Sequence, residues 1–192
     1  MTYLILGLIV FLGVHSVRIV ADGWRAAQLK RLGEGAWKGV YSLLSLAGFG
    51  LIVWGYAQAR QEPVALWTAP VAMRHVAALL TLIAFVLLVS AYVPRNSIKS
   101  VLHHPMVLAV KVWAFAHLLA NGTLADLVLF GAFLAWAVAS YAAARKRDRA
   151  AGTQYPAGTM AGTAATIFVG AVTWAAFAFW LHGALIGVRP FG

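Results

Sequence analysis

The chain has no cysteine and very little negative charge. Only five of its 192 residues are acidic, whereas fifteen are Lys or Arg. Without cysteine, thiol catalysis, disulfide bonds and thiolate metal sites are all excluded. Asp126 is the only acid near an apolar segment, so the carboxylates that would complete a zinc or di-iron site are also missing. Histidine, present six times, is the conventional ligand that remains for a metal or a metal-bearing cofactor.

Long apolar runs are what the chain has in abundance, because 62% of its residues are hydrophobic. A helix needs about 20 predominantly apolar residues to cross a bilayer. The pattern predicts an all-α membrane protein, a single transmembrane domain over residues 1–192 built as a bundle of six helices. The predicted spans are residues 2–20, 40–59, 74–93, 105–120, 123–144 and 163–188. The first is interpreted as a retained span rather than a signal peptide, because its positive charges follow the apolar run.

The net charge of +10 is a feature that nucleic-acid-binding proteins share, but its distribution indicates a membrane protein and no nucleic-acid partner. Eleven basic residues flank or occupy the segments after the first, third and fifth spans, against three at the alternate ends. This bias predicts that both termini lie on the non-cytoplasmic side of a bacterial inner membrane. Residues 21–39 are expected to form a loop, and Arg145–Gly162 a flexible cytoplasmic loop, because of its charge, Gly and Pro content.

Ionisable side chains inside a span are costly, so each is a hypothesis of function. His15 lies three residues before Arg18, on the same face of the first span. In one interpretation His15 hydrogen-bonds a neighbouring carbonyl while Arg18 extends to the interface. In the other, His15 is an axial ligand and Arg18 binds an anionic group, for which its planar guanidinium is suited.

Residues 105–120 form the most polar span. His117 follows Trp113 by four residues and shares its helical face. Lys111 follows His104 by seven residues, so these two share a face on the opposite side from His117. Lys111 serves either as a structural partner of a carbonyl or as part of a site. The remaining histidines lie near span ends, where interfacial hydrogen bonding is the ordinary role of such side chains; they are His75, His103 and His182. Isolated histidines on aromatic-rich, carboxylate-poor helices favour haem over a bare metal ion, because haem needs one or two axial ligands and an apolar pocket.

Four segments carry a family resemblance: "FLGVHSVRI" (11–19), "GEGAWKGVYSLLSLAGFGLIVWGY" (33–56), "HHPMVLAVKVWAFAHLLANG" (103–122) and "LLANGTLADLVLFGAFLAWAV" (118–138). Together they resemble the NnrU family of bacterial membrane proteins over nearly the whole chain. The resemblance implies a link to denitrification and nitric oxide metabolism.

Plant and cyanobacterial isomerases of 15-cis-zeta-carotene share this domain and use haem b. The similarity places their axial ligands on His15 and His117, while their cysteine before the second ligand corresponds to Ala114 here. Cofactor-binding roles are then expected for His15, His117, Arg18 and Trp113. By depth in the predicted spans, His75 with His117, or His15 with His104, would also form a level pair, so His75, His104 and Lys111 stay as further candidates.

A more distant similarity is to membrane methyltransferases of the isoprenylcysteine type, whose "RHP" element stands where this chain has "HHP" at His103–Pro105. It implies S-adenosylmethionine docking near His104. Three functions follow as expectations: a haem-dependent redox enzyme or isomerase acting on a lipid-soluble or gaseous substrate, a non-catalytic accessory protein of nitric oxide and nitrite reductases, or a methyltransferase.

Overall fold

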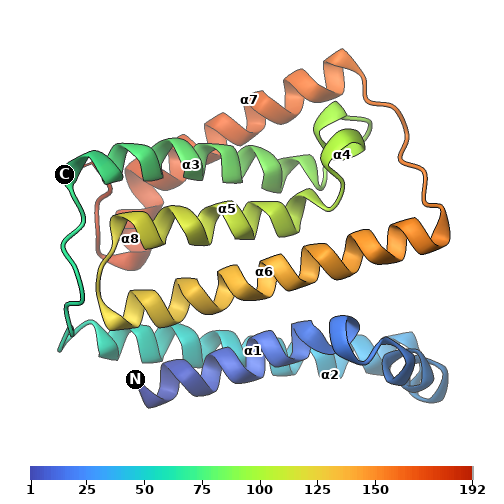
Figure 1. The fold of residues 1–192 in the computed structure, drawn as a ribbon, viewed down its shortest axis with the longest axis horizontal. Helices are drawn as coiled ribbons and strands as arrows, with labels where there is room; N and C mark the ends of the chain where they lie inside the picture. Colours follow the sequence, from blue (N-terminus) through green and yellow to red (C-terminus); the bar gives the residue numbers. More distant parts are fainter. Residues whose placement is uncertain (192) are drawn as a thin grey trace. The chain divides into compact units, whose positions relative to one another are not determined.

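The computed structural model describes residues 1–191, which fold almost entirely as helices. Across these residues there is no β-strand, only the isolated bridges Ala65–Thr123 and Asn96–Thr159. In chain order the elements in Figure 1 are α1 (Thr2–Val20), α2 (Asp22–Ala59), α3 (Val71–Ser90), α4 (Ser97–Leu102), α5 (Pro105–Ala120), α6 (Leu124–Ala151), α7 (Met160–Ala176), the π-helical turn η1 (Phe177–Leu181) and α8 (His182–Ile186).

Five helical segments are long and apolar enough to cross a membrane: α1, α2, α3, α6 and the continuous run Met160–Ile186. The 16-residue α5 is also apolar but, at the helical rise, it extends only about 24 Å, less than the roughly 30 Å hydrocarbon core. Large apolar side chains point outward from these segments, among them Leu43, Phe168 and Trp180, each 69% exposed. Such a surface is suited to lipid rather than water, so the chain is a multi-pass membrane protein.

Two compact units make up the chain. The first comprises Met1–Thr68 and Gly122–Ser140, and the second Ala69–Asn121 and Tyr141–Gly192. Helix α6 contributes its first part to the first unit and its last turns to the second. Of the predicted site residues, His15 and Arg18 belong to the first unit and His117 belongs to the second.

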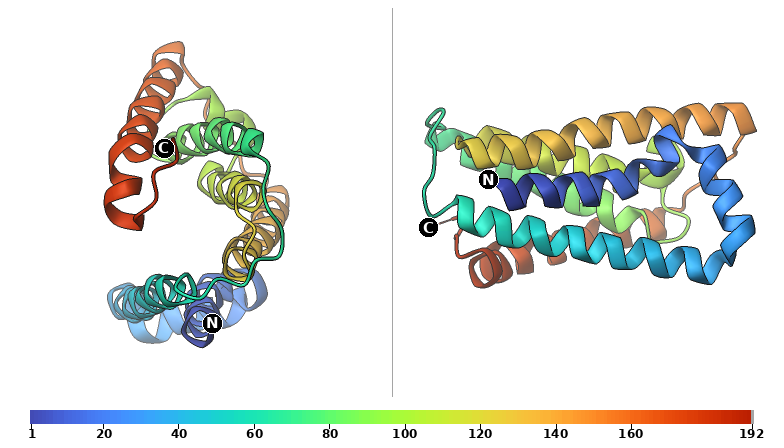
Figure 2. Two further views of the ribbon diagram at one scale, coloured as in Figure 1. Left: turned by 90° about the vertical axis from the view of Figure 1, so that its left-hand side faces the viewer. Right: turned by 90° about the horizontal axis from the view of Figure 1, so that it is seen from below.

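In the first unit, α1 and α2 lie side by side (Figures 1 and 2) because glycines let their backbones approach. Gly55 of α2 lies against Leu4, and Gly7 of α1 against Ile52. A Cβ atom added to Gly48 would lie 2.8 Å from the backbone nitrogen of Phe11, which is closer than atoms pack. The contact between α1 and α2 therefore depends on these small residues.

The start of α6 is fastened within the same unit. Thr123 and Asp126 bond each other reciprocally, with the Thr123 backbone N–H donating to the carboxylate at 3.0 Å and the Asp126 backbone N–H donating to the Thr123 hydroxyl at 3.2 Å. This is a capping box. The Tyr56 hydroxyl of α2 donates to the other oxygen of Asp126. Asp126, which is 5% exposed, thus satisfies a helix start and joins α2 to α6.

In the second unit, α3 packs against α5 and α7. The Trp174 Nε1–H of α7 donates to the Thr81 hydroxyl of α3 at 3.1 Å. Near the other end of α7, Gly162 lies against the carbonyl of Arg95, where no Cβ would fit. These contacts hold α7 along α3.

Residues 21–39 are helical, so the prediction of a loop there is wrong. Only Ala21 separates α1 from α2, which begins at Asp22. The segment after Asp22 is rich in strong helix formers such as Ala, Gln, Leu, Lys and Arg, and polarity does not prevent a helix. The helix bends at Gly33, whose φ of 79° is left-handed and is readily adopted only by glycine.

The flexible loop predicted over Arg145–Gly162 is also wrong in part, because α6 continues to Ala151. The remainder is held by hydrogen bonds. The Thr153 N–H donates to the Asp148 carbonyl at 2.9 Å, and the Thr159 N–H donates to the Arg95 carbonyl at 2.7 Å. Thr159 also caps α7 by accepting from the Gly162 N–H. The Gly and Pro residues between α6 and α7 therefore belong to a hydrogen-bonded connection.

Candidate functional site

His15 lies on α1 in a cluster of aromatic rings from three helices of the first unit. Its ring stacks on Phe11 at a centroid distance of 4.2 Å, and it lies 5.2 Å from Tyr41 of α2. Trp136 of α6 meets it edge-on at 6.1 Å. The imidazole is half-buried. Aromatic rings of this kind form an apolar wall around one polar side chain.

The hydrogen bond of His15 determines which ring nitrogen carries the proton. Its Nδ1 lies 2.7 Å from the carbonyl oxygen of Phe11, one helical turn earlier. A carbonyl only accepts, so Nδ1 donates and the neutral ring has its lone pair on Nε2. In many metal sites a histidine is oriented in this way: Nδ1–H donates to a backbone carbonyl, and the lone pair of Nε2 binds the metal.

His117 has the same arrangement on α5 in the second unit. Its Nδ1 lies 2.9 Å from the Trp113 carbonyl, and the two rings are 5.1 Å apart. Asn121 ends the helix by bonding the His117 carbonyl through both its backbone N–H and its side-chain amide, each at 2.9 Å. The His117 ring therefore also has its lone pair on Nε2.

The Trp136 side chain is a feature that sequence reasoning missed. Its indole Nε1–H is buried without a hydrogen-bond partner in the described chain. Buried Trp N–H groups usually find an acceptor. A bound molecule could supply the acceptor that the Trp136 N–H lacks. A Trp in the middle of a predicted span, rather than at its edge, was the signal that could have indicated it.

The other predicted site residues differ in how far they are exposed. Arg18 is exposed on the last turn of α1. His75 is exposed near the start of α3, and Lys111 is half-buried on α5. Among residues 1–191, no group of three or more His, Asp or Glu side chains is placed to hold a metal ion.

His104 belongs to a different cluster, also in the second unit. Its Nε2 lies 2.8 Å from an Asp148 oxygen of α6. That same oxygen accepts from the Tyr155 hydroxyl at 3.0 Å and from Arg145 at 3.2 Å. Asp148 therefore joins α5, α6 and the connection that follows α6. The contact between His104 and Asp148 could not be predicted from the sequence, since 44 positions separate the two residues.

The backbone beside this cluster is strained. His103 and His104 have φ values of 56° and 35°, in the left-handed region that residues with a Cβ rarely adopt. Burial and the Arg145 guanidinium lower the pKa of His103, whose ring meets Tyr155 edge-on at 4.1 Å. Burial and the hydrogen bond to Asp148 raise the pKa of Tyr155. A hollow of about 220 Å³ lies beside His104, bordered by Lys99 and Tyr155.

The family model described as NnrU protein matches residues 3–190. No curated protein and no solved structure matches the chain. The matched region includes the aromatic cluster around His15, the His117 helix and the His104 cluster. The chain belongs to the NnrU protein family.

Proposed function

We propose that this protein binds b-type haem and that His15 of the first unit and His117 of the second unit are the residues that would hold it. The observation that carries the proposal is the shared hydrogen-bonding of the two rings. Each imidazole donates Nδ1–H to the carbonyl four residues earlier. When neutral, each ring is therefore in the Nδ1–H tautomer, which is the one that orients many histidine ligands of metals.

The donor set agrees with haem in further respects. Histidine pairs ligate haem without help from carboxylates or thiolates, and the chain has no cysteine and few acids. Aromatic rings at Phe11, Tyr41 and Trp136 supply an apolar wall around His15. Arg18 follows one turn later on α1, where a guanidinium suits a propionate.

A haem held this way supplies one-electron redox chemistry or a binding place for a small molecule such as nitric oxide. The protein's own contribution is to hold the two rings in a fixed tautomer, exclude water with aromatic side chains and neutralise a carboxylate with Arg18. Family membership supports a role in denitrification or nitric oxide metabolism, either through a gaseous or lipid-soluble substrate or as an accessory of nitric oxide and nitrite reductases. The location we propose is the bacterial inner membrane, with the five long segments and the shorter α5 as six spans and both termini outside the cytoplasm.

The methyltransferase alternative finds less support. S-adenosylmethionine would dock beside His104, where the hollow is about 220 Å³. Sites for ligands of that size are typically about 300–1,000 Å³, and Asp148 already engages the polar edge of His104. Haem binding is therefore the function we put to the test.

The test is an absorbance spectrum of the full-length protein purified from haem-supplemented cells. We expect a Soret band, with one haem per chain, in the wild type. His15→Ala and His117→Ala should each lower the haem content or change the absorbance spectrum of the haem that remains. His182→Ala is the matched control, because His182 also donates Nδ1–H to a carbonyl, that of Val188, but is not in the proposed pair.

A colourless wild-type preparation would overturn haem binding. Full haem content with an unchanged spectrum in both His15→Ala and His117→Ala would overturn the ligand assignment. Retention of the band in His182→Ala, together with its loss in the other two variants, would support the assignment.

A further inference from the structure

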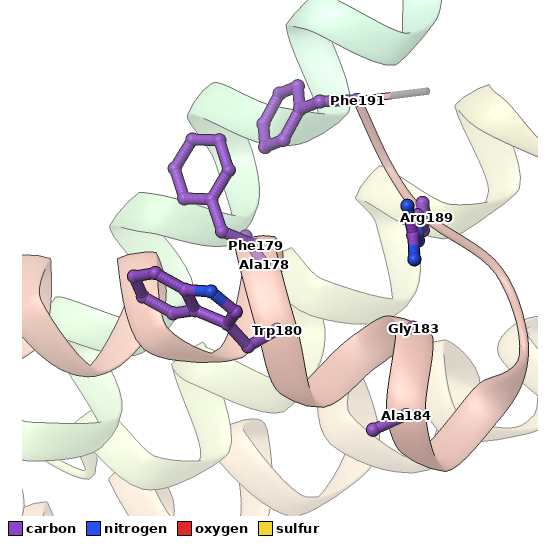
Figure 3. A pocket seen from close by; sticks show the side chains of 7 residues that line it. All are labelled: Ala178, Phe179, Trp180, Gly183, Ala184, Arg189 and Phe191. Carbon is purple, nitrogen blue, oxygen red and sulfur yellow. The ribbon is translucent and has the colours of Figure 1, made fainter.

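A hollow of about 480 Å³ lies at the C-terminal end of the second unit, and no histidine lines it. Figure 3 shows its lining: the helix from Ala178 to Ala184 on one side, and the returning segment with Arg189 and Phe191 on the other. Its volume lies within the range of about 300–1,000 Å³ that is typical of small-molecule sites. The lining combines three aromatic rings with a single cation.

Local structure places Arg189 over this hollow. Gly187, with a left-handed φ of 77°, ends α8 and turns the chain back. His182 then donates Nδ1–H to the Val188 carbonyl at 2.6 Å, which fixes the returning segment. Gly183 leaves room for the Arg189 stem, since a Cβ there would lie 3.2 Å from Arg189 Cγ. The turn thus places Arg189 in the lining of the hollow.

The aromatic side of the hollow is equally ordered. Phe179 and Phe191 stack with centroids 5.0 Å apart, and Trp180 lies 6.3 Å from Phe179 (Figure 3). Phe179 and Trp180 come from the π-helical turn η1, a kind of turn that is frequent at functional sites. Trp180 is 69% exposed, and such a ring at the end of an apolar span prefers the level of lipid headgroups.

The charge of Arg189 has no side-chain counterion in its own unit. Asp148 is the one acid in residues 69–121 and 141–192. That carboxylate already binds Arg145, His104 and Tyr155. An anion for Arg189 therefore has to come from outside the unit's side chains.

We propose that the hollow binds the phosphate group of an anionic membrane lipid. Arg189 contacts the phosphate, for which its planar fork of donors is suited. The rings of Phe179, Trp180 and Phe191 lie against the apolar part of the lipid. Exposed aromatic walls at the end of a membrane span favour an amphiphile over a free phosphate, which would leave them unused.

The experiment is native mass spectrometry of the full-length protein in detergent, titrated with phosphatidylglycerol, phosphatidylcholine or inorganic phosphate. We expect phosphatidylglycerol to bind about tenfold more tightly than phosphatidylcholine, because both lipids offer Arg189 a phosphate but the choline cation of phosphatidylcholine repels the guanidinium. Arg189→Gln should remove this preference.

Arg74→Gln is the matched control, because it removes the same charge from an exposed residue of the same unit that does not line the hollow. It should leave the preference unchanged. Ala184→Phe, which fills the hollow from an exposed helical position, should weaken phosphatidylglycerol binding while keeping every charge. It keeps the proposal testable should Arg189→Gln fail to fold.

Equal phosphatidylglycerol preference in wild type, Arg189→Gln and Ala184→Phe would overturn the site. Inorganic phosphate binding to the wild type as tightly as phosphatidylglycerol, with the same loss in Arg189→Gln, would overturn the lipid as its occupant.

Discussion

The chemistry of each histidine is set by the acceptor nearest to it. His15 and His117 donate Nδ1–H to the carbonyl one turn earlier in their own helices. His104 instead contacts a carboxylate 44 residues away through Nε2. The first kind of partner is a property of any helix, whereas the second exists only because α6 reaches the start of α5. The same side chain therefore bonds a backbone carbonyl through Nδ1 in two places and a carboxylate through Nε2 in a third.

At this scale we predict an acid-sensitive contribution from His103. Its pKa is lowered in the folded state from the usual 6.5 by burial and by Arg145, while His104, Asp148 and Tyr155 also face it. The unfolded chain therefore takes up the proton first, so this contribution is full above about pH 6.5 and is lost as the pH falls below it. Between pH 7.5 and 5.5, Tm should fall by about 1–3 °C more in the wild type than in His103→Asn.

Thermal unfolding in detergent at a series of pH values measures this difference. His75→Asn is the control, since His75 is exposed on α3, and it should follow the wild type. Identical pH dependence in all three proteins would contradict the prediction.

Helices α1 and α2 pack through glycines rather than through large side chains. Burying apolar side chains between helices yields little in lipid, so close backbone approach stabilises such pairs. Gly48 and Gly50 lie on the same helix, yet a Cβ on Gly48 meets the Phe11 backbone and a Cβ on Gly50 meets nothing within 4 Å. Gly48 thus lies on the face of α2 that contacts α1, whereas Gly50 lies on a face that is open to lipid.

This contrast yields a paired prediction at the scale of the element. Gly48→Ala should destabilise the protein by about 1–3 kcal/mol, because overpacking moves backbones apart. Gly50→Ala should be neutral or stabilising by up to about 1 kcal/mol, because Ala is the better helix former. Unfolding by denaturing detergent measures both free energies, and equal effects of the two substitutions would refute the close packing of α1 on α2.

At the scale of the whole molecule, the ends of the helices are joined in two groups. The Ala65–Thr123 bridge joins the segment after α2 to the start of α6. The Asn96–Thr159 bridge joins the segment after α3 to the start of α7. The proposed orientation assigns the basic segment Arg145–Arg149 to the cytoplasmic side.

The absence of cysteine makes this assignment directly testable. We expect Glu62→Cys, exposed in the segment after α2, to react with a membrane-impermeant maleimide in intact spheroplasts. Thr153→Cys, exposed after α6, should react only after the membrane is broken. The wild type provides the unlabelled control. Labelling of Thr153→Cys from outside, with protection of Glu62→Cys, would reverse the orientation.

Family, class and most helices followed from the sequence by itself, because apolar length and helix propensity are local properties. The proton on Nδ1 of His15 is local too, since its acceptor lies one turn away. Polarity was a poor guide to helix ends, as the helical segment after Asp22 shows. Only the tertiary structure decided that Asp148 meets His104, that Trp136 approaches His15 and that Arg189 overlies an aromatic hollow. Those contacts depend on which helix faces pack together, and residues far apart in the sequence carry no local trace of that choice.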